Sequence, residues 1–438
     1  MSEPTDVSLH VTILWRHADW GLYGRRHEAI SRELARRAEV KSVLHVEPVS
    51  VPDAGRLLRD WWTADRSSMK EAYAAQLRKL LCLQPRRVQE GLYATSVLTL
   101  LNRTYPLPVE TINRRLLRWQ FGLLRKFRRQ LEGDYTYTLA YPPGMYIPEA
   151  LRVLQSDVVL ADVVDDVLAR VNDARLARMY RDSHRTVFDA ADHAFTTSEK
   201  VVDRFEDASC AIDVLPNGVT VPEEGYEQDI SARCFSGSAE DRRPLAMYAG
   251  QLNQALDAEM ITSVAERCPE ICFRFYGPVS DPAGRRLATA LTERPNVDVA
   301  GSVPHTELQR YLSQADVLLN FKKPDHTTSG NDLLKIYEYL ATGRPIVSPC
   351  VSPVDRFEDV IRVAETPDQF ADQVRAALRD ESEERSKRRV AYARSNSWAS
   401  RVDDILSTFY SLYPVTGSKT SPGAGHSTMV EKTGGKWQ

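Results

Sequence analysis

Residues 317–348, VLLNFKKPDHTTSGNDLLKIYEYLATGRPIVS, contain the pattern that decides the fold. Val317–Asn320 is a short apolar run that predicts a buried strand, and Asn331–Ala341 has the apolar spacing of a helix. Gly343 stands where helices commonly end in a left-handed residue, and Pro345–Ser348 is a second strand-like run. A strand, a helix and a strand in this order predict a unit of a parallel α/β sheet.

The same alternation extends in both directions along the chain. In the second half we expect strands at Leu245–Ala249, Cys272–Tyr276 and Val297–Ala300, and helices at Ala258–Arg267, Pro282–Arg294, Thr306–Ala315 and near 367–394. In the first half we expect strands at Val11–Trp15, Lys41–Glu47, Tyr135–Ala140, Asp157–Val164, Ala194–Thr197 and Ile212–Leu215, with polar, helical character at 51–90. The strand runs are apolar without alternation, which is typical of parallel strands covered on both faces.

A chain of 438 residues is long enough for two or three domains. The Pro-Asn-Gly sequence at 216–218 is a strong turn signal between the two series of elements. We therefore expect two Rossmann-like, doubly wound domains, residues 1–217 and 218–397, that face a central cleft. A helix at 398–412 is expected to pack back on the first domain, and the Gly/Ser/Thr-rich residues 414–438 are expected to be disordered.

The composition argues against several classes of protein. Hydrophobic residues make up 42% of the chain, as in ordinary globular proteins, and a net charge of −3 lacks the basic excess of a nucleic-acid binder. No run of about 18 apolar residues is present, and the N-terminus lacks the layout of a signal peptide. Six cysteines are too few for a disulfide scaffold, and no Cys-x-x-Cys pair marks a metal site. We expect a cytoplasmic protein that does not bind nucleic acid.

Lys335 and Glu338 are three residues apart, so they lie on one face of the helix expected at Asn331–Ala341. A helix start preceded by a glycine, here Gly330, offers free backbone N–H groups and the positive end of the helix dipole to a phosphate. A lysine in the first two turns adds a full charge, and a carboxylate one turn later can accept hydrogen bonds from two hydroxyls, such as those of a ribose. The alternative interpretation is a surface ion pair between the two side chains.

The helix and its ending resemble a known family. Glu338 and the following ATGRPIV at 341–347 are similar to the donor-site helix of GT-B-fold glycosyltransferases, especially the retaining enzymes of family 4. That family carries a Glu-x7-Glu pattern, whose first glutamate falls on Gly330 here. Further segments agree in position and order, namely LPNGVTVP at 215–222, YAGQLNQALD at 248–257, FRFYGP at 273–278 and NVDVAGSVPHTELQRYLSQADVLLN at 296–320. The resemblance covers residues 135–412 well and 10–50 weakly.

The resemblance implies a GT-B fold with a donor site in the second domain. Glu338 should bind the ribose of a nucleotide-diphosphate sugar, and Lys335 should hold its pyrophosphate. The other implied donor-site residues are Asn331 and Asp332 at the phosphate, Gly250 and Gln251 in the cleft, and Gly277, Pro278, Ser302 and Val303 at the base. The Arg/Lys pair common in family 4 is absent, and Asp257 is a candidate to take over part of its work. The resemblance implies no metal ion and no other cofactor.

Asp162, Asp165 and Asp166 lie at the C-terminal end of a predicted strand, at the edge where such sheets bind ligands. Three interpretations remain open for these carboxylates: a divalent metal site, binding of substrate hydroxyls or action as a base, and capping of the next helix. The Asp-x-x-Asp-Asp spacing differs from the Asp-x-Asp motif of metal-dependent glycosyltransferases. We retain Asp165 and Asp166, with Lys335, as candidate catalytic residues.

The first domain is expected to bind the acceptor. Gly24, Arg25 and His27 stand in or beside the turn before the first helix, where a glycine lets the backbone approach a ligand. Arg25 or Arg26 is a candidate to bind an anionic acceptor group such as a phosphate or a uronate, and a solvated basic helix start is the alternative. Tyr141 follows a strand and is expected to line the acceptor side, or to serve packing alone.

Residues 109–132 are expected to form a long basic helix with interleaved aromatic and leucine side chains. Such a helix can lie on an anionic membrane surface, which would make the protein peripheral on the inner face of the cell membrane. The alternative is a helix packed on its own domain with a solvated basic face.

Together these features predict a glycosyltransferase that moves a sugar from a nucleotide-diphosphate donor to an acceptor hydroxyl of a glycan, a lipid-linked acceptor or a small molecule. The resemblance implies retention of configuration. Electrostatic stabilisation of the departing diphosphate would be the main catalytic contribution, with Lys335 as its leading candidate. Two alternatives are a sugar-nucleotide epimerase of the same fold and a non-catalytic protein that binds a nucleotide sugar.

Overall fold

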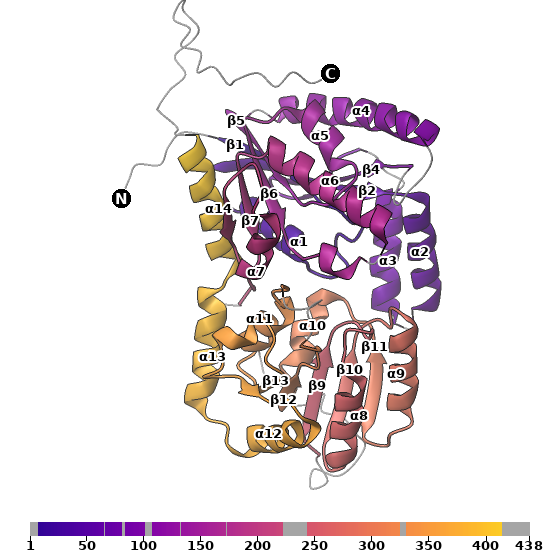
Figure 1. Ribbon diagram of the computed structural model, residues 1–438, viewed down its shortest axis with the longest axis vertical. Helices are drawn as coiled ribbons and strands as arrows, with labels where there is room; N and C mark the ends of the chain where they lie inside the picture. Colours follow the sequence, from indigo (N-terminus) through magenta and orange to yellow (C-terminus); the bar gives the residue numbers. More distant parts are fainter. Residues whose placement is uncertain are drawn as a thin grey trace, which may run out of the picture.

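A computed structural model of the protein describes residues 8–64, 66–80, 84–100, 107–131, 133–171, 173–221, 243–324 and 330–413. Two α/β domains are stacked on one another, and each is built on its own sheet (Figure 1). The tail expected to be disordered, residues 414–438, lies outside the described part of the chain.

The N-terminal domain has an eight-stranded sheet in the order β3-β4-β2-β1-β5-β6-β7-β8. Its strands are β1 (Leu9–Leu14), β2 (Val40–Val49), β3 (Arg86–Gln89), β4 (Leu92–Leu98), β5 (Tyr135–Ala140), β6 (Val158–Val163), β7 (His193–Thr196) and β8 (Ile212–Val214). Its helices are α1 (Arg26–Leu34), α2 (Val51–Thr63), α3 (Ser67–Leu80), α4 (Leu107–Gln130), α5 (Ile147–Leu154), α6 (Ala174–Ala190) and α7 (Glu199–Val202). Neighbouring strands are parallel, except that β3 pairs antiparallel with β4 at the edge of the sheet.

The C-terminal domain has a six-stranded parallel sheet in the order β11-β10-β9-β12-β13-β14. Its strands are β9 (Leu245–Ala249), β10 (Cys272–Tyr276), β11 (Val297–Gly301), β12 (Val317–Leu319), β13 (Ile346–Ser348) and β14 (Arg362–Val363). The helices of this half are α8 (Ala258–Arg267), α9 (Pro282–Thr292), α10 (His305–Leu312), α11 (Leu334–Ala341), α12 (Pro367–Arg379), α13 (Glu383–Ser395) and α14 (Trp398–Leu412). The two sheets confirm the predicted α/β class with two Rossmann-like domains.

Three local predictions differ from the structure. Residues 51–90 are not only helical, because β3 begins there, and β4 after it also extends the first sheet by pairing with β2. The single helix expected near 367–394 is two helices, and the Ser382 side chain caps the second by accepting from the N–H of Arg385 at 3.2 Å. The helix expected from Asn331 begins at Leu334, because the preceding residues bond to the segment that links the domains.

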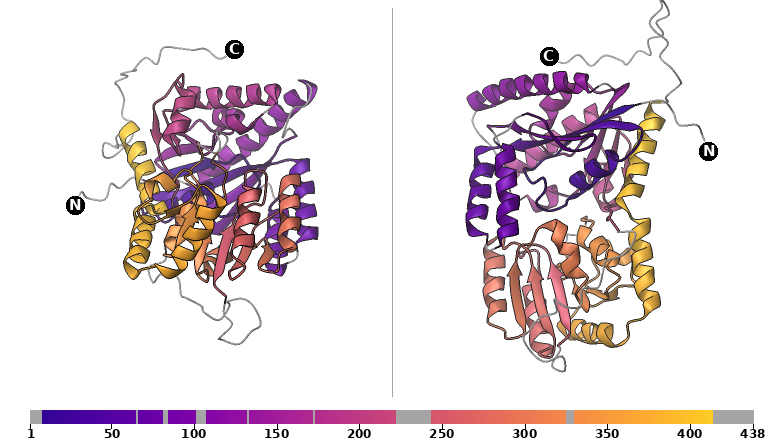
Figure 2. Two further views of the ribbon diagram at one scale, coloured as in Figure 1. Left: turned by 60° about the horizontal axis from the view of Figure 1, so that its bottom comes forward. Right: turned by 180° about the vertical axis from the view of Figure 1, so that it is seen from behind.

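The chain crosses between the domains twice at one place. The N–H of Val219 donates to the carbonyl of Asn396 at 3.0 Å, and the N–H of Trp398 donates back to Val219 at 3.2 Å. Helix α14 then lies on the first sheet, where Phe409 stacks on Tyr137 with ring centroids 4.1 Å apart. Helices α13 and α14 thus run along the side of both domains, which Figure 2 also shows from behind.

Helices α2 and α3 form a hairpin beside the cleft. The Ser50 side chain accepts from the N–H of Asp53 at 3.3 Å, and the Asp53 carboxylate accepts from the N–H of Ser50 at 3.2 Å, a reciprocal cap that starts α2. At the turn of the hairpin, Arg66 donates to the carbonyl of Ala300 in the C-terminal domain at 3.2 Å. The hairpin therefore touches both domains (Figure 1).

Among the residues that the structure describes, no helix combines the length and the hydropathy that a membrane-spanning segment requires.

Candidate active site between the two domains

A cavity of about 430 Å³ lies between the two domains. Several residues that line it come directly after the C-terminal ends of strands in both sheets, for example Trp15 after β1, Gly250 after β9 and Gly277 after β10. Ligands of doubly wound sheets bind at such ends. We refer to this space as the interdomain cavity.

Two glycines form the floor of the interdomain cavity on the side of the C-terminal domain. Gly250 and Gly277 have φ angles of +149° and +140°, which side chains rarely adopt. A Cβ atom on Gly250 would overlap Lys335 Nζ and the Tyr248 hydroxyl, and one on Gly277 would overlap the Gly250 carbonyl. Neither position therefore has room for a side chain, and both glycines line the interdomain cavity next to a lysine.

Lys335 lies in the first turn of α11, with its amine above the ring of Tyr248. Nζ is 4.2 Å from the ring centroid and donates to the Tyr248 hydroxyl at 2.9 Å. Burial, with a smaller contribution from Lys322, lowers the pKa of Lys335 to about 7. Burial also raises the pKa of Tyr248, so its hydroxyl keeps the proton that it donates to the Gln251 carbonyl at 3.2 Å. Lys335 thus presents a cation that an anionic ligand would stabilise.

Glu338 lies one turn further along α11 and lines the same cavity. It does not pair with Lys335; its Oε1 atom is 2.5 Å from His305 Nε2. Burial alone would lower the pKa of His305, but the Glu338 carboxylate raises it above its usual value. Gly24 of the N-terminal domain has a φ of +55° and packs directly against His305. Glu338 is therefore a buried carboxylate at the point where the two domains meet.

Asn331 and Asp332 line the cavity before α11 begins. The N–H of Asn217 donates to Asp332 Oδ2 at 2.5 Å, and the Asn217 side chain donates to the Asp332 carbonyl at 2.7 Å. Tyr337 donates its hydroxyl to Asp332 Oδ1 at 2.9 Å, and Arg356 forms an ion pair with the same carboxylate. The Asp332 side chain therefore fastens the segment before α11 to the link between the domains.

The remaining predicted donor residues separate into two groups. Gln251, Pro278, Ser302 and Val303 line the interdomain cavity. Asp257 does not line it, because its carboxylate caps α8 by accepting from the N–H of Met260 at 2.9 Å.

The three acidic residues at the end of β6, with Asp162 inside the strand and Asp165 and Asp166 after it, have different surroundings. Asp162 is fully buried and pairs with Arg26 at 2.7 Å, whereas Asp165 pairs with Arg16 at 2.7 Å and borders the cavity. Asp166 accepts from the N–H of Ala169 at 3.0 Å and from the Arg204 side chain, and it does not line the interdomain cavity. Within the described ranges, no group of three or more His, Cys, Asp or Glu side chains could hold a metal ion.

The predicted acceptor residues are only partly at the cavity. Arg25 lines it, but His27 is buried beneath its wall, stacked on Trp15 with ring centroids 3.9 Å apart and 2.8 Å from His45 between ring nitrogens. Tyr141 is also fully buried and does not border the interdomain cavity. Both side chains are buried in the N-terminal domain beneath the cavity wall, so they support that wall by packing.

A second cavity of about 350 Å³ adjoins the first within the N-terminal domain. Tyr23, Arg25 and Gln251 line both spaces. Site residues that the sequence analysis did not single out are Arg16 and Arg56 in the second cavity, and Met69, His305 and Lys322 in the first. They come from separate segments, and no local motif connects them.

Comparison with known families gives one match. Residues 242–407, most of the C-terminal domain, match a family model described as glycosyl transferase-like. The sequence matches none of the curated proteins.

Comparison with solved structures shows that both domains together have the GT-B fold. A sucrose-phosphate synthase from Thermosynechococcus elongatus is 15% identical with a TM-score of 0.65, over 93% of this chain and 100% of that one. An alpha,alpha-trehalose-phosphate synthase from Burkholderia xenovorans, in complex with glucose-6-phosphate, is 11% identical with a TM-score of 0.60, over 92% and 99%. Anabaena HepE in complex with UDP-glucose is 11% identical with a TM-score of 0.58, also over 92% and 99%. The predicted GT-B fold is thereby confirmed.

Proposed function

We propose that the protein is a glycosyltransferase that moves a sugar from a nucleotide-diphosphate donor to an acceptor hydroxyl. The observation that carries this proposal is the amine of Lys335, held next to Gly250 in a cavity that Gly277 and Glu338 also line. A lysine beside bare backbone suits a diphosphate, and a buried carboxylate suits the two hydroxyls of a ribose. The glycosyl transferase-like match over residues 242–407 supports the same function for this domain.

The chemistry that we propose depends on charge at the leaving group. The bond between the sugar C1 and the diphosphate oxygen breaks, and the acceptor oxygen bonds to C1. Lys335 stabilises the negative charge that develops on the diphosphate, a role in which one lost donor typically costs about 10²–10³ in kcat. The acceptor proton passes to the departing diphosphate, because the nearby Asp165 carboxylate is already paired with Arg16.

Two finer features belong to the same proposal. We propose retention of configuration, supported by the resemblance of α11 to retaining enzymes, and NMR of the product anomer tests it. We also propose that side-chain cations rather than a bound metal neutralise the diphosphate, with Lys335, Lys322 and Arg25 bordering the cavity. Activity should then be the same with and without EDTA, and a loss that Mg²⁺ or Mn²⁺ restores would contradict this feature.

A thermal-shift panel of nucleoside diphosphates and nucleotide sugars tests the donor site. UDP-glucose comes first, because the HepE structure of the same fold contains it. A ligand at 100 times its Kd should stabilise the wild-type protein by about 2.7 kcal/mol. Lys335→Ala should lose this stabilisation, whereas Lys387→Ala, which removes a lysine that is 74% exposed on α13, should keep it. If no nucleotide stabilises the wild type, the donor site is not where we propose.

The two alternatives predict different reactions. An epimerase would convert the donor sugar without any acceptor, and a non-catalytic protein would bind the donor without releasing a nucleoside diphosphate. A transferase releases the diphosphate in step with an added acceptor. Measuring diphosphate release and donor-sugar composition, with and without an acceptor panel, separates the three.

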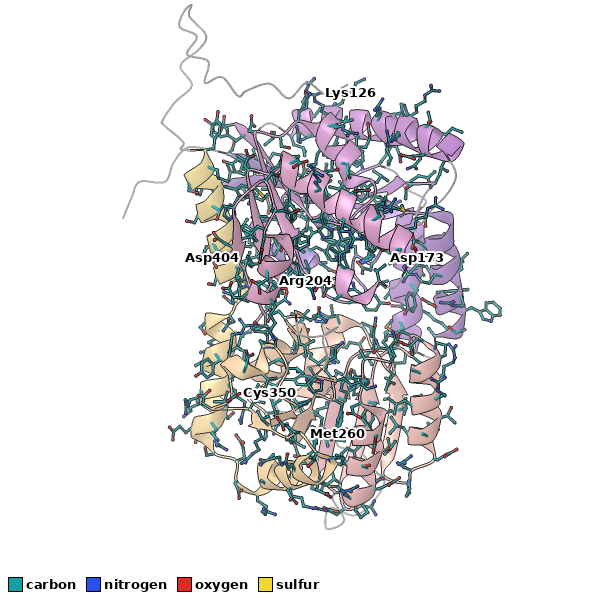
Figure 3. All side chains as sticks on the ribbon, viewed as in Figure 1. Lys126, Asp173, Arg204, Met260, Cys350 and Asp404 are labelled. Carbon is teal, nitrogen blue, oxygen red and sulfur yellow. The ribbon has the colours of Figure 1, made fainter. Side chains whose placement is uncertain are left out.

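We also propose that one exposed face of α4 attaches the protein to anionic membranes. Ile112, Trp119 and Leu123 are exposed large apolar side chains on this helix. Seven Lys and Arg residues accompany them within α4, against the single acid Glu110, although the whole chain has a net charge of −3. Figure 3 shows Lys126 projecting from this helix at the end of the molecule opposite the C-terminal domain.

Vesicle sedimentation tests this attachment. The protein should bind vesicles of phosphatidylcholine with 30% phosphatidylglycerol more strongly than pure phosphatidylcholine, and less strongly as salt rises. Trp119→Ser should weaken binding. Trp62→Ser removes an exposed tryptophan from α2 and should not weaken it. Equal binding to both kinds of vesicle would contradict the proposal.

A further inference from the structure

Three arginines surround the second cavity, which we call the arginine cavity. Arg16 follows β1, Arg25 precedes α1, and Arg56 lies in the second turn of α2. The cavity encloses about 350 Å³, enough for a small ligand group. Two acidic residues, Asp19 and Asp53, share its wall, so the availability of the three guanidinium groups depends on what those carboxylates bind.

The two carboxylates are occupied mainly by other donors. Asp19 Oδ1 accepts from the indole N–H of Trp15 at 2.7 Å, and its Oδ2 is 3.3 Å from Arg25 Nε. Asp53 Oδ2 caps α2, and its Oδ1 lies 3.7 Å from Arg56, beyond ordinary hydrogen-bond length. A guanidinium has five N–H donors. Arg25 and Arg56 therefore keep donors for a ligand.

Arg16 has a buried donor that lacks a partner. Its side chain is 5% exposed; Nη2 pairs with Asp165 at 2.7 Å, and Nη1 donates to the carbonyl of Pro142 at 3.4 Å. Among the described residues, no acceptor lies within hydrogen-bond distance of Arg16 Nε. A buried donor without a partner destabilises the protein, so an acceptor atom from a ligand would be favourable there.

We propose that the arginine cavity binds an anionic group, a phosphate or a carboxylate, carried by the acceptor. Planar guanidinium groups match the oxygens of both anions in a bidentate geometry. Apart from Gln251, the residues that line this cavity belong to the N-terminal domain, whereas Lys335 and Glu338 belong to the C-terminal domain. Arg25, Tyr23 and Gln251 line both cavities, so an anion held by Arg16 and Arg56 leaves the acceptor hydroxyl facing the donor. This assignment names the acceptor class of the proposed transferase and rests on that function.

Inorganic phosphate is the probe for the arginine cavity, titrated calorimetrically in the presence of saturating UDP. UDP occupies the donor site, so the remaining phosphate binding reports the second site. Wild-type protein should bind one phosphate saturably. Arg56→Ala and Arg25→Gln should weaken phosphate at least tenfold. The matched control is Arg59→Ala, in the same helix but 70% exposed and paired with Asp60, and it should bind phosphate as the wild type does.

Two results would overturn the proposal. One is the absence of saturable phosphate binding to the UDP complex, and the other is an equal loss in the Arg56 and Arg59 variants. Lys335→Ala separates this proposal from the proposed function, because it should lose UDP binding and retain phosphate binding. If UDP fails to bind the wild-type protein while phosphate still binds, the donor site fails and the anion site stands.

A final comparison distinguishes the two substrates that could carry the anion. UDP-glucuronate carries a carboxylate on its donor sugar, and UDP-glucose does not. If the acceptor carries the anion, phosphate should bind with equal affinity in the presence of either nucleotide sugar. If UDP-glucuronate weakens phosphate binding and UDP-glucose does not, the arginine cavity binds the anionic group of the donor sugar. That result would overturn the acceptor assignment.

Discussion

The two walls of the interdomain cavity are built in different ways. On the side of the C-terminal domain, Gly250, Gly277, Lys335 and Glu338 lie at the ends of short strands and in one helix, with their polar groups directed at the cavity. On the side of the N-terminal domain, charged residues are paired with each other, as in Arg26 with Asp162 and Arg16 with Asp165.

This difference separates binding from support. The C-terminal wall keeps a lysine without a carboxylate partner among the described residues, so its charge is available to a ligand. The N-terminal wall uses most of its charge internally, and the Arg26–Asp162 pair also reaches the interdomain link, because Arg26 donates to the Pro216 carbonyl at 2.9 Å. Substitutions in the C-terminal wall should change donor binding, and substitutions in the buried ion pair of Arg26 and Asp162 should change stability.

The largest expected effect is at the glycine floor. Gly250→Val should abolish UDP binding, because its side chain would occupy the space of Lys335 Nζ and demands a backbone angle that valine avoids. Calorimetric titration measures the loss. Gly55→Ala is the control, because Gly55 lies within α2 with no atom within 4 Å of an added Cβ, and it should increase stability by about 0.5–1 kcal/mol. UDP binding by the valine variant would contradict the proposed position of the diphosphate.

The next largest effect is on stability and concerns the buried ion pair in the N-terminal wall. Asp162→Ala should lower the free energy of unfolding by about 3–5 kcal/mol, because Arg26 would remain buried without its partner. Urea denaturation measures this, and the affinity for UDP should not change. Asp404→Ala removes a 55% exposed partner of a 4.0 Å pair and should cost at most about 1 kcal/mol. Equal costs in the two variants would show that the buried pair does not support this wall.

Glu338→Gln should weaken UDP binding about 10–100-fold, because an amide replaces a charged acceptor of the ribose hydroxyls. The comparison of UDP with its 2′-deoxy analogue locates the effect. The wild type should prefer UDP, and the variant should lose most of that preference. A variant that discriminates as well as the wild type would show that Glu338 does not bind the ribose.

The smallest effect is a dependence on pH. The pKa of Lys335 is lowered to about 7 in the free protein, and a bound diphosphate should raise it because the charged amine gains an anionic partner. UDP binding therefore takes up a proton above pH 7, and affinity should fall up to about tenfold for each further pH unit. Lys335→Arg should flatten this slope, since an arginine stays charged. An unchanged slope in that variant would assign the titration to another group.

The residues of the C-terminal wall were largely predictable, because the family resemblance indicated them and each lies in or next to an element that the local sequence predicts. Gly250, Gly277, Lys335 and Glu338 each follow a strand or lie in a helix that apolar spacing reveals, and all four line the cavity. The start of α11 was not predictable, because Asn331 and Asp332 look like the beginning of a helix. Their actual conformation depends on bonds to Asn217, more than a hundred residues earlier in the chain.

The N-terminal wall was less predictable, because it depends on ion pairs between residues that are far apart in the sequence. Arg26 and His27 share a helix start with Arg25, yet only the fold shows that Asp162 binds Arg26 and that Trp15 covers His27. Arg56 reaches the same space from a helix that carries no motif. Burial and ion pairing across long sequence separations decide these positions, and local spacing does not encode them.

Helix α14 has a consequence for the order in which the protein folds. Trp398, Val402 and Phe409 are buried in the core of the N-terminal domain, although they are translated after the whole C-terminal sheet. Domains generally fold as their chain leaves the ribosome, but this first domain lacks one wall of its core until residue 409 has emerged. The nascent chain must therefore carry an incomplete domain through the synthesis of a second one. A stop codon shortly before α14 would remove little of the sequence and leave that apolar surface permanently uncovered.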